Sequence, residues 1–340
     1  MRKRVGKVGR TTLILFCGLS IISLILENRT KRRVFSAFYE EKVKAVELAK
    51  TAFSLVREER LRLGMGIDSI NDPYLTGLIG SPTSPITSGR ISLDEVLLTT
   101  GPNFAGILVS LLKREGIKSG ETVLVFVDGS FPGLYLSFLA AFKVLSLNPF
   151  IIGSLTSNSW GANHPALTYL DMERVVRSAG LFPFATSFVS LGGEDDYGLG
   201  LSPFAREMLY LAGERNGVRF CAPKMKSTLA PKGARFFINI GNSPAANFFL
   251  SEAKRRRMKV FDFSRSKVRR FLEEEGIGEK DLFAPIGKGK IFEEERYSVG
   301  WTIFFIAVLL FALYFIIRYD IEFYLLSKKE RERILEEEAI

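Results

Sequence analysis

The chain has 340 residues, of which 47% are hydrophobic and 29 are phenylalanine. This composition excludes disorder as the main state, because so many apolar side chains can bury a core. Lys and Arg outnumber Asp and Glu by 47 to 37, for a formal net charge of +10, and the mean hydropathy is +0.14. With two cysteines and one histidine, the sequence excludes a disulfide scaffold, a four-cysteine zinc site and any site that needs two histidines.

The N-terminus combines a basic tail with an apolar segment. Residues 1–10 carry five cations, and Thr11 to Leu26 (TTLILFCGLSIISLIL) carry no charge. At ~1.5 Å per residue this segment spans roughly 24 Å, and flanking arginines can cover the remaining thickness of a bilayer. No small-residue cleavage site follows it. Residues 11–27 are therefore predicted to be an uncleaved transmembrane signal anchor, with a cleaved signal peptide as the alternative.

The next segment has helical periodicity. Residues 28–70 are predicted to contain an amphipathic stalk helix, which covers Val34 to Leu63. Its apolar positions at helical spacing are Phe38, Val46, Ala49, Phe53 and Val56. A loop rich in proline and glycine follows, from Asp72 to Gly89.

Beyond this loop, short apolar strands alternate with amphipathic helices. Strands are predicted over Glu121–Asp128, Phe150–Leu155, Thr186–Leu191, Val218–Cys221, Arg235–Ile240 and Lys259–Phe263. Helices are predicted over Asn103–Glu115, Pro132–Leu145, Asp171–Gly180, Ser202–Asn216, Pro244–Arg257 and Arg265–Glu275. Residues 71–298 are therefore predicted to form an α/β domain. Its sheet is expected to be mostly parallel, doubly wound and Rossmann-like, with ligands at the carboxyl ends of the strands.

A second uncharged segment, Val299–Ile317, is predicted to be another transmembrane helix. Two spans place both tails on one side of the membrane. A short tail with five cations is hard to translocate, whereas large domains cross largely regardless of charge. Residues 1–10 and 318–340 are therefore predicted to be cytoplasmic, and the domain extracytoplasmic. Residues 28–298 hold 37 basic and 29 acidic side chains, so the domain itself carries about +8.

Two strand-to-helix junctions resemble each other: GSFP at 129–132 and GNSP at 241–244. Hydroxyl groups there can cap the helices, and free backbone N–H groups can bind an anion or a carboxylate. Ser130 is also a candidate catalytic nucleophile. The full Gly-x-Ser-x-Gly elbow is missing, however, and His164 would have to be the base. The candidate ligand-binding residues at these junctions are Gly129, Ser130, Gly241 and Ser243.

A polar loop, SNSWGANHP at 157–165, follows the second predicted strand. It is either a structured loop or the wall of a polar ligand pocket. In the first interpretation, Asp171 is the N-cap of the next helix and Glu173 lies in its first turn. Asn103, at the start of the first predicted helix, is expected at the strand ends as well. The candidate ligand-binding residues of this group are Asn103, Ser159, Trp160, Asn163, Asp171 and Glu173.

Charged clusters occur at two further places. Glu194, Asp195 and Asp196 supply oxygen ligands for a divalent cation, but a solvated acidic turn accounts for them, so no metal site is assigned. No dinucleotide fingerprint or P-loop is present, and no cofactor is assigned. Nine basic residues and one acid lie between residues 254 and 270, where either the helix dipole or a polyanion accounts for the charge. The predicted polyanion patch comprises Lys254, Arg255, Arg256, Arg257, Arg269 and Arg270.

Several segments together resemble the poly-γ-glutamate system protein family. They are TGLIGSPTSPITS (Thr76–Ser88), PNFAGILVSLL (Pro102–Leu112), GSFPGL (Gly129–Leu134) and SWGANHPALTYLDME (Ser159–Glu173). The family contains accessory membrane proteins associated with bacterial poly-γ-glutamate capsule synthesis. The resemblance implies a place in the cell membrane, and other subunits of a polymer synthesis complex as partners. It implies no reaction, and residues 99–102 depart from the family pattern and receive no role.

The sequence thus predicts a two-span membrane protein that assists synthesis, export or anchoring of an anionic polymer by binding or assembly. Poly-γ-glutamate has one carboxylate per residue, so a basic domain would hold it with salt-dependent affinity. Nucleic acid is not expected as a partner outside a membrane. The alternative is a membrane-tethered hydrolase or transferase that acts on the polymer, or on a cell-envelope amide or ester, through Ser130. A cleft that joins Ser130 to a base would favour the enzyme.

Overall fold

The computed structural model describes residues 8, 10–221, 231 and 233–319. The predicted cytoplasmic tails, 1–10 and 318–340, therefore lie almost entirely outside the described residues. The chain divides into two units. The helix-pair unit comprises the described residues of 1–35 and 294–340, and the α/β unit comprises 36–293.

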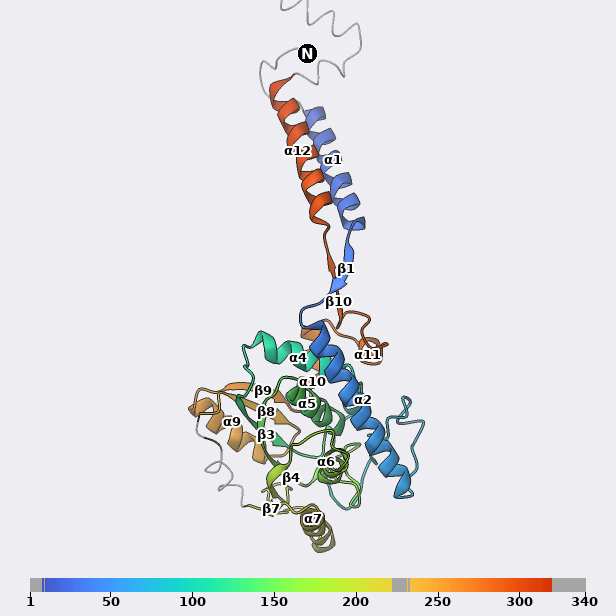
Figure 1. Ribbon diagram of the computed structural model, residues 1–340, viewed down its shortest axis with the longest axis vertical. Coiled ribbons are helices and arrows are strands. Elements are labelled where there is room, and N and C mark those ends of the chain that lie inside the picture. Colours follow the sequence, from blue (N-terminus) through green and yellow to red (C-terminus); the bar gives the residue numbers. More distant parts are fainter. Residues whose placement is uncertain (1–7, 9, 222–230, 232, 320–340) are drawn as a thin grey trace, which may run out of the picture. The chain divides into compact units, whose positions relative to one another are not determined.

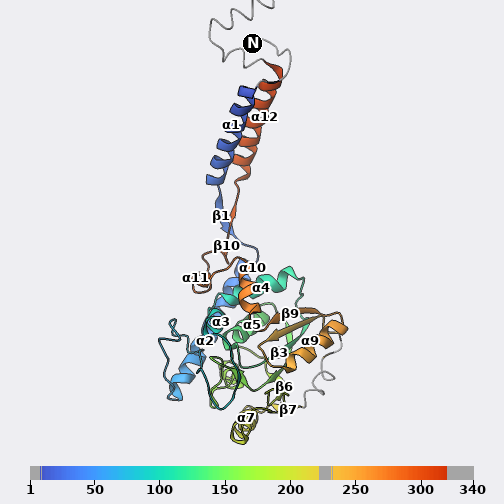
Figure 2. The same ribbon diagram turned by 180° about the vertical axis from the view of Figure 1, so that it is seen from behind.

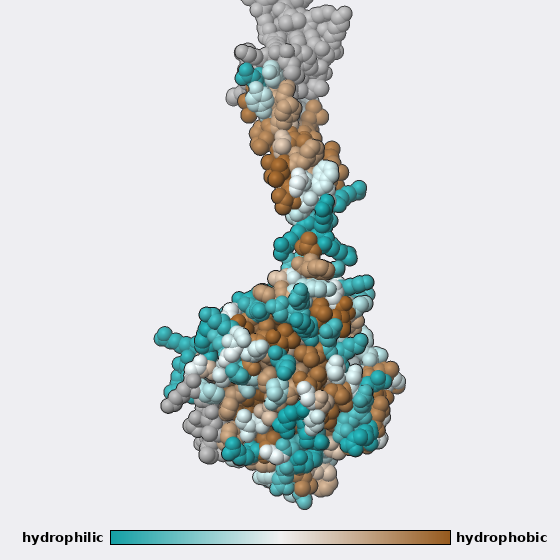
Figure 3. Space-filling view, in the orientation of Figure 1, coloured by the Kyte–Doolittle hydropathy of each residue, from teal (hydrophilic) through white to brown (hydrophobic). Residues whose placement is uncertain are grey.

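In the helix-pair unit, α1 (Arg10–Arg29) and α12 (Val299–Arg318) lie side by side (Figures 1 and 2). Each is long and apolar enough to cross a membrane, which agrees with the predicted spans at 11–27 and 299–317. Figure 3 shows apolar side chains over much of the visible face of this helix pair. Thr302 Oγ1 donates a hydrogen bond to Glu27 Oε1 at 2.7 Å, which joins the two helices. The strands β1 (Arg32–Phe35) and β10 (Glu293–Arg296) pair with each other.

The predicted stalk helix over residues 28–70 is corrected by the structure. Helix α1 ends at Arg29, β1 follows, and α2 covers only Tyr39–Arg62. Mostly small or branched side chains, with one phenylalanine, are buried on one face of α2 and pack against α4 (Phe104–Arg114) and α5 (Pro132–Val144). These are Ala45, Val46, Ala49, Ala52, Phe53 and Val56. Helix α2 is therefore part of the core of the α/β unit.

The α/β unit contains a six-stranded parallel sheet in the order β7-β6-β4-β3-β8-β9. Its strands are β3 (Thr122–Val127), β4 (Asn148–Ser154), β6 (Thr186–Ser190), β7 (Arg219–Phe220), β8 (Phe236–Ile240) and β9 (Lys259–Phe263). The predicted parallel α/β architecture is confirmed. The order proceeds outwards from β3 in one direction through β4, β6 and β7. The later strands β8 and β9 are added on the other side of β3, so the strand order changes direction between β3 and β8.

Helices cover both faces of this sheet (Figure 1). Alternate residues of β3, such as Val123 and Val125, belong to the larger core, which includes side chains of α2, α4, α5 and α6 (Tyr169–Ser178). The intervening residues Leu124 and Phe126 face the smaller core, where Phe249 of α9 (Ala245–Arg255) packs. Helix α5 is buried almost completely, because α2 and α4 pack against it as well.

Smaller elements complete the α/β unit. Strand β2 (Thr87–Gly89) pairs in parallel with β5 (Ser157–Asn158). Helix α3 (Leu93–Thr99) meets α4 at a bend of 73°. These two apolar helices are long enough to cross a membrane only if they are counted as one segment. Side chains of both helices belong to the core of the α/β unit. Among the residues that the structure describes, the other helices of this unit are α7 (Pro203–Arg215), α10 (Lys267–Glu274) and α11 (Glu279–Leu282).

Candidate functional site

The two junctions with similar sequences meet at the carboxyl edge of the sheet. Strands β3 and β8 are neighbours in register, with Val127 beside Ile240. The segments 129–132 and 241–244 leave these strands at the point where the strand order changes direction. This is the position at which open α/β sheets commonly bind ligands.

A buried carboxylate occupies this position. Asp128 is 3% exposed, and its Oδ1 accepts the N–H of Ser130 at 2.7 Å. Its Oδ2 accepts the N–H groups of Asn242 and Ser243, each at 2.6 Å. Gly241 has φ +127°, and a Cβ there would overlap the carboxylate. Asp128 was not among the predicted site residues, although an acid at the end of the apolar strand ETVLVFVD was a signal for it.

The anion site predicted at these junctions is corrected by this arrangement. The N–H groups offered to an external anion donate to Asp128 instead. Burial raises the pKa of Asp128, and the hydrogen bonds from Ser130, Asn242 and Ser243 oppose that rise. A second anion at this place would find these N–H donors already occupied. At this junction, the carboxyl group of Asp128 is therefore the internal acceptor for the backbone N–H groups.

Ser130 lies inside the same junction and is completely buried. Its Oγ accepts a hydrogen bond from Asn158 Nδ2 at 2.9 Å. The N-cap of α5 is Phe131, which makes no side-chain cap, so Ser130 does not cap the helix. The candidate base His164 is exposed, and its Nδ1 accepts the N–H of Ala166 at 3.2 Å. Partial burial, together with nearby arginines, lowers the pKa of this imidazole.

The polar loop at 157–165 packs against the segment that contains Ser81 and Gly89. Asn163 donates to Ser81 O at 2.7 Å and accepts the Ser81 N–H at 3.0 Å. The N–H of Trp160 also donates to Ser81 O, at 2.9 Å. Ser159 Oγ donates to Gly89 O at 3.2 Å. These candidate ligand-binding residues hold two loops together, which is the structured-loop alternative.

Asp171 stabilises the start of α6 rather than a ligand. The helix begins at Tyr169 with Thr168 as its N-cap, so the predicted N-cap at Asp171 is wrong by three residues, and Asp171 is the third residue of the helix. Asp171 accepts the N–H and hydroxyl of Thr168 and two bonds from Arg215, at 2.8 and 2.6 Å. Burial raises the pKa of Asp171, but the hydrogen bonds from Arg215 and Asn216 outweigh it, and the net shift is downwards.

Two other candidates also make internal contacts. Glu173 is buried, and its carboxylate accepts hydrogen bonds from Tyr135 and from the N–H of Thr186. Burial raises its pKa, and these hydrogen bonds oppose the rise. Asn103 precedes α4, where its Nδ2 donates to the carbonyl oxygens of Asp281 and Ala284, both at 2.9 Å. Asn103 therefore joins α4 to the segment around α11.

The carboxyl edge continues as a chain of hydroxyl groups. Ser243 Oγ donates to Ser154 Oγ at 3.2 Å, and Ser154 and Ser190 share a hydrogen bond at 3.1 Å. Ser154 also donates to the buried carboxylate of Asp196. The chain leads to a hollow of about 190 Å³ beside β6 and β7. The hollow is lined by Ser190, Leu191, Asp196, Tyr197, Tyr210, Phe220 and Cys221.

The acidic turn that contains Asp196 does not gather its carboxylates. Asp196 is buried, whereas Glu194 and Asp195 are exposed. Asp195 accepts the N–H groups of Tyr197 and Leu199, at 2.8 and 2.9 Å. Within the described ranges, no three His, Cys, Asp or Glu side chains are grouped to hold a metal ion.

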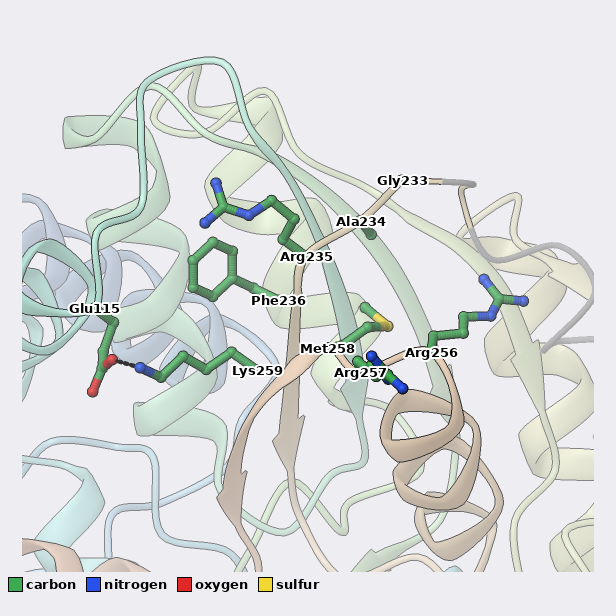
Figure 4. Close-up of a pocket in the computed structure, with 9 residues that line it drawn as sticks. All are labelled: Glu115, Gly233, Ala234, Arg235, Phe236, Arg256, Arg257, Met258 and Lys259. Atoms are coloured by element: carbon green, nitrogen blue, oxygen red, sulfur yellow. Dashed lines mark ion pairs between the residues drawn. The ribbon is translucent and has the colours of Figure 1, made fainter.

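The opposite, amino edge of the sheet carries cations. A hollow of about 800 Å³ lies where β8 and β9 begin (Figure 4). Its lining contains four cations and one carboxylate. The lining residues are Glu115, Gly233, Ala234, Arg235, Phe236, Arg256, Arg257, Met258 and Lys259. This basic hollow is the main cationic feature that the structure adds to the predicted patch.

Some cations of the basic hollow have acidic partners. Lys259 forms an ion pair with Glu115, and Arg235 Nη1 lies 2.7 Å from Glu121 Oε1. Arg256 Nε lies 2.6 Å from Glu252, which Arg255 also contacts at 2.8 Å. Hydrogen bonds from these two arginines lower the pKa of Glu252 to about 2. Arg257, with φ +56°, forms no ion pair with the part of the chain that the structure describes.

The predicted patch of six cations is corrected to two separate groups. Lys254 to Arg257 lie at the end of α9, before β9 begins at Lys259. Arg269 and Arg270 lie on α10, after β9 ends. Five strand residues at about 3.3 Å each separate the two groups, which places them at opposite edges of the sheet. Arg270 is paired with Glu274 at 2.8 Å.

Compared with known proteins, the chain matches no protein-family model and no curated protein.

Proposed function

We propose that the α/β unit binds an anionic polymer, of which poly-γ-glutamate is the expected example. In this proposal the protein is an accessory membrane component of polymer synthesis, export or anchoring, and it acts with other subunits of that complex. The observation that carries the proposal is the basic hollow, where four cations and one carboxylate surround about 800 Å³. The overall charge of about +8 on residues 28–298 adds a longer-range attraction for anions.

The geometry of the basic hollow suits exchange of partners. Lys259 and Arg235 are half exposed or more, at 50% and 63%, and their ion pairs are accessible to solvent. Such pairs contribute little net free energy, so a ligand carboxylate can replace the internal one at small cost. A polymer with one carboxylate per residue can contact several of these cations together.

The proposed arrangement in the membrane is that of two spans, with both tails cytoplasmic and the α/β unit extracytoplasmic. We also assign the sheet to the doubly wound, Rossmann-like class, which the strand order supports. The arrangement can be tested by labelling intact cells with a membrane-impermeant maleimide. In a Cys17→Ser, Cys221→Ser background, Ile70→Cys, whose parent side chain is 87% exposed, should react. Labelling only after lysis would contradict the proposed orientation.

The alternative, a membrane-tethered hydrolase or transferase that uses Ser130, has less support. Ser130 is completely buried, and its Oγ already accepts a bond from Asn158. The adjacent carboxylate of Asp128 uses both oxygens on backbone N–H groups. A nucleophile would need an accessible hydroxyl beside a free base.

Polymer binding can be tested with the full chain in nanodiscs of zwitterionic lipid. Immobilised poly-γ-glutamate should bind the protein at low salt and release it at high salt. A triple variant, R235Q/R256Q/R257Q, should lose at least about tenfold in affinity, because each exposed ionic contact is worth roughly two- to fivefold. The control R62Q/R114Q/R270Q removes the same charge from exposed arginines elsewhere in the α/β unit.

Two results would overturn the proposed function. One is equal loss of affinity in both triple variants, which would show dependence on total charge alone. The other is binding that does not change with salt. Separately, if the chain turned over a defined amide or ester and a folded Ser130→Ala variant lost that turnover, the enzyme alternative would replace the polymer-binding proposal.

A further inference from the structure

We propose that the groove between α3 and α10 is a docking site for a partner polypeptide in which basic side chains flank apolar ones. The α3–α10 groove, as we call it, is a hollow of about 440 Å³ on the α/β unit. Its lining comes from three residues each of α3, α10 and the segment 277–279 at the start of α11. It shares no residue with the basic hollow, so the inference goes beyond polymer binding and does not depend on it.

The two helices of the α3–α10 groove are held together within the α/β unit. They contact each other, and Figure 2 labels both. The buried carboxylate of Glu95, on α3, accepts the N–H of Ser266 where α10 begins. The groove is therefore formed without a partner, so a ligand does not have to bring its two sides together.

The floor of the α3–α10 groove is apolar. Leu98 and Leu272 contribute to the lining, although they are only 8% and 2% exposed and belong to the larger core. Leu97 and Ile277 are partly buried against the same core, which leaves part of each side chain open to the groove. Apolar surface of this kind contributes free energy when an apolar side chain of a partner covers it. The floor therefore favours a leucine-like side chain.

The rim of the α3–α10 groove is charged and mostly acidic. Its exposed side chains are three carboxylates, of Asp94, Glu273 and Glu279, and one guanidinium, of Arg269, which give a formal charge of −2. Asp94, Glu273 and Arg269 form no ion pair with the part of the chain that the structure describes. Residues 28–298 carry about +8, so this rim is an acidic exception on a basic domain.

An aromatic pair fixes one carboxylate of the rim. Glu279 Oε1 accepts the hydroxyl of Tyr74 at 2.9 Å, and Tyr74 stacks on Phe283 with ring centroids 3.5 Å apart. Tyr74 is 42% exposed, so this pair extends the apolar surface beyond the hollow. The carboxylate of Glu279 is thus positioned before a partner binds.

Floor and rim together limit the kind of partner. A neutral apolar partner would bury three carboxylates without a counter-charge, which costs free energy. An anionic polymer would be repelled by the rim. The hollow holds about fifteen water molecules at ~30 Å³ each, which is room for several side chains. A polypeptide segment with Lys or Arg on either side of leucine-like residues supplies both cations for the rim and apolar groups for the floor.

The full chain in nanodiscs of zwitterionic lipid can be titrated with the peptide acetyl-KLLK-amide, with binding followed by ligand-detected NMR against empty nanodiscs. The charge-reversed peptide acetyl-ELLE-amide should bind at least about fivefold more weakly, because it places carboxylates against the acidic rim. The peptide acetyl-KSSK-amide should also bind at least about fivefold more weakly, because it lacks apolar side chains for the floor. Equal affinity for the KLLK and ELLE peptides would overturn the proposal.

Variants of the rim locate the binding. D94N/E273Q/E279Q should weaken binding of the KLLK peptide at least about fivefold, because it removes three exposed ionic contacts. The control E47Q/E58Q/E214Q removes the same charge from exposed acids elsewhere in the α/β unit and should change the affinity less than twofold. Equal losses in both variants would overturn the proposal, since they would show attraction to total charge alone.

A change that strengthens binding guards against loss of folding. Arg269→Glu makes the rim more acidic and should tighten binding of the KLLK peptide at least about twofold, which a misfolded variant cannot imitate. Weaker binding by a folded Arg269→Glu variant would contradict the proposed contact with the rim. The R235Q/R256Q/R257Q variant should bind the KLLK peptide as the parent does, so polymer binding and peptide docking can fail independently.

Discussion

The two edges of the central sheet carry opposite charges and hold them differently. At the amino edge, the cations of the basic hollow are exposed and pair with side chains such as Glu115 and Glu121. At the carboxyl edge, Asp128 and Asp196 are buried and are held by backbone N–H groups and hydroxyls. In a parallel α/β fold, helices begin at the carboxyl edge and end at the amino edge. Helix dipoles therefore favour acids at the first and cations at the second.

Helix dipoles favour one sign of charge at each edge, but Arg269 and Arg270 place cations at the carboxyl edge as well, and the accessibility of each charge follows from its side chain. Long arginines at the end of α9 reach solvent, and short aspartates at the strand ends do not. The amino edge is therefore the proposed surface for a large anionic ligand, whose affinity would fall as the salt concentration rises.

The largest effect is expected from Asp128→Ala, which tests the buried charge at the carboxyl edge. The variant leaves the N–H groups of Ser130, Asn242 and Ser243 without their acceptor, which costs about 3 kcal/mol or more of unfolding free energy. Denaturant unfolding of the full chain in detergent, in a Trp301→Phe background, allows Trp160 to report. Formate should restore part of the loss, because it can occupy the vacated position. An effect no larger than that of the exposed control Asp94→Ala would contradict this account.

The second-largest effect is expected from Asp171→Asn and depends on pH, because the pKa of Asp171 is lowered whereas burial raises the pKa of Asp128. The folded pKa of Asp171 is lowered, so its contribution is present above the unfolded value of about 3.9 and is lost as pH falls through the folded pKa. Asp171→Asn should therefore cost about 2 kcal/mol at pH 7 and progressively less below pH ~4. The same unfolding experiment, repeated at several pH values, measures this difference. The control Glu194→Gln should show a small cost, and a cost for Asp171→Asn that is constant with pH would be inconsistent with the paired carboxylate.

A smaller effect is expected from Ser130→Ala. The variant removes the acceptor of one buried hydrogen bond from Asn158, which is worth about 1 kcal/mol. Polymer production in cells should be unchanged, because the hydroxyl contributes to packing of the junction and not to a reaction. The polymer yield relative to wild type is the measurement, with Ser251→Ala on the exposed side of α9 as the control. Loss of polymer in a stably folded variant would return Ser130 to the position of a nucleophile.

The smallest effect is expected from Arg257→Gln, which tests whether the two groups of cations contribute separately to polymer binding. Arg257→Gln should reduce affinity for poly-γ-glutamate by about twofold at low salt, with a smaller difference at high salt. Arg270→Gln, the matched change at the other edge, should leave affinity unchanged. The affinities of these two variants for poly-γ-glutamate are measured on full-length protein in nanodiscs. Equal reductions would favour one continuous patch over the division that β9 imposes.

Local patterns explain which elements could be predicted. The two apolar helices and strand β9 follow the predicted ranges closely, because length, hydropathy and periodicity depend on neighbouring residues. Helix α6 begins before its predicted start, because Thr168 and Asp171 form the capping box together. The short strands β1 and β10 were not predicted. Each is four residues long and pairs with a segment far away in the sequence.

The site was less predictable because it depends on distant partners. Asp128 accepts from residues that follow it by 114 and 115 positions, so its role becomes visible only when β3 and β8 are adjacent. Asn103, Ser159 and Asn163 have polar side chains that suit a ligand, but the structure pairs them with backbone carbonyl groups of distant segments. Residue type alone does not distinguish these two uses.

The two apolar helices, the parallel α/β class and the excess of positive charge could be predicted from the amino-acid sequence, since each follows from composition or from short-range periodicity. The positions of those charges in the molecule depend on the tertiary structure. Strand β9 divides the run of cations between two edges, and Asp128 fills the anion position at the junction. The physical reason is that a parallel sheet alternately brings chain segments to opposite edges, so residues that are close in sequence become separated and distant residues become partners.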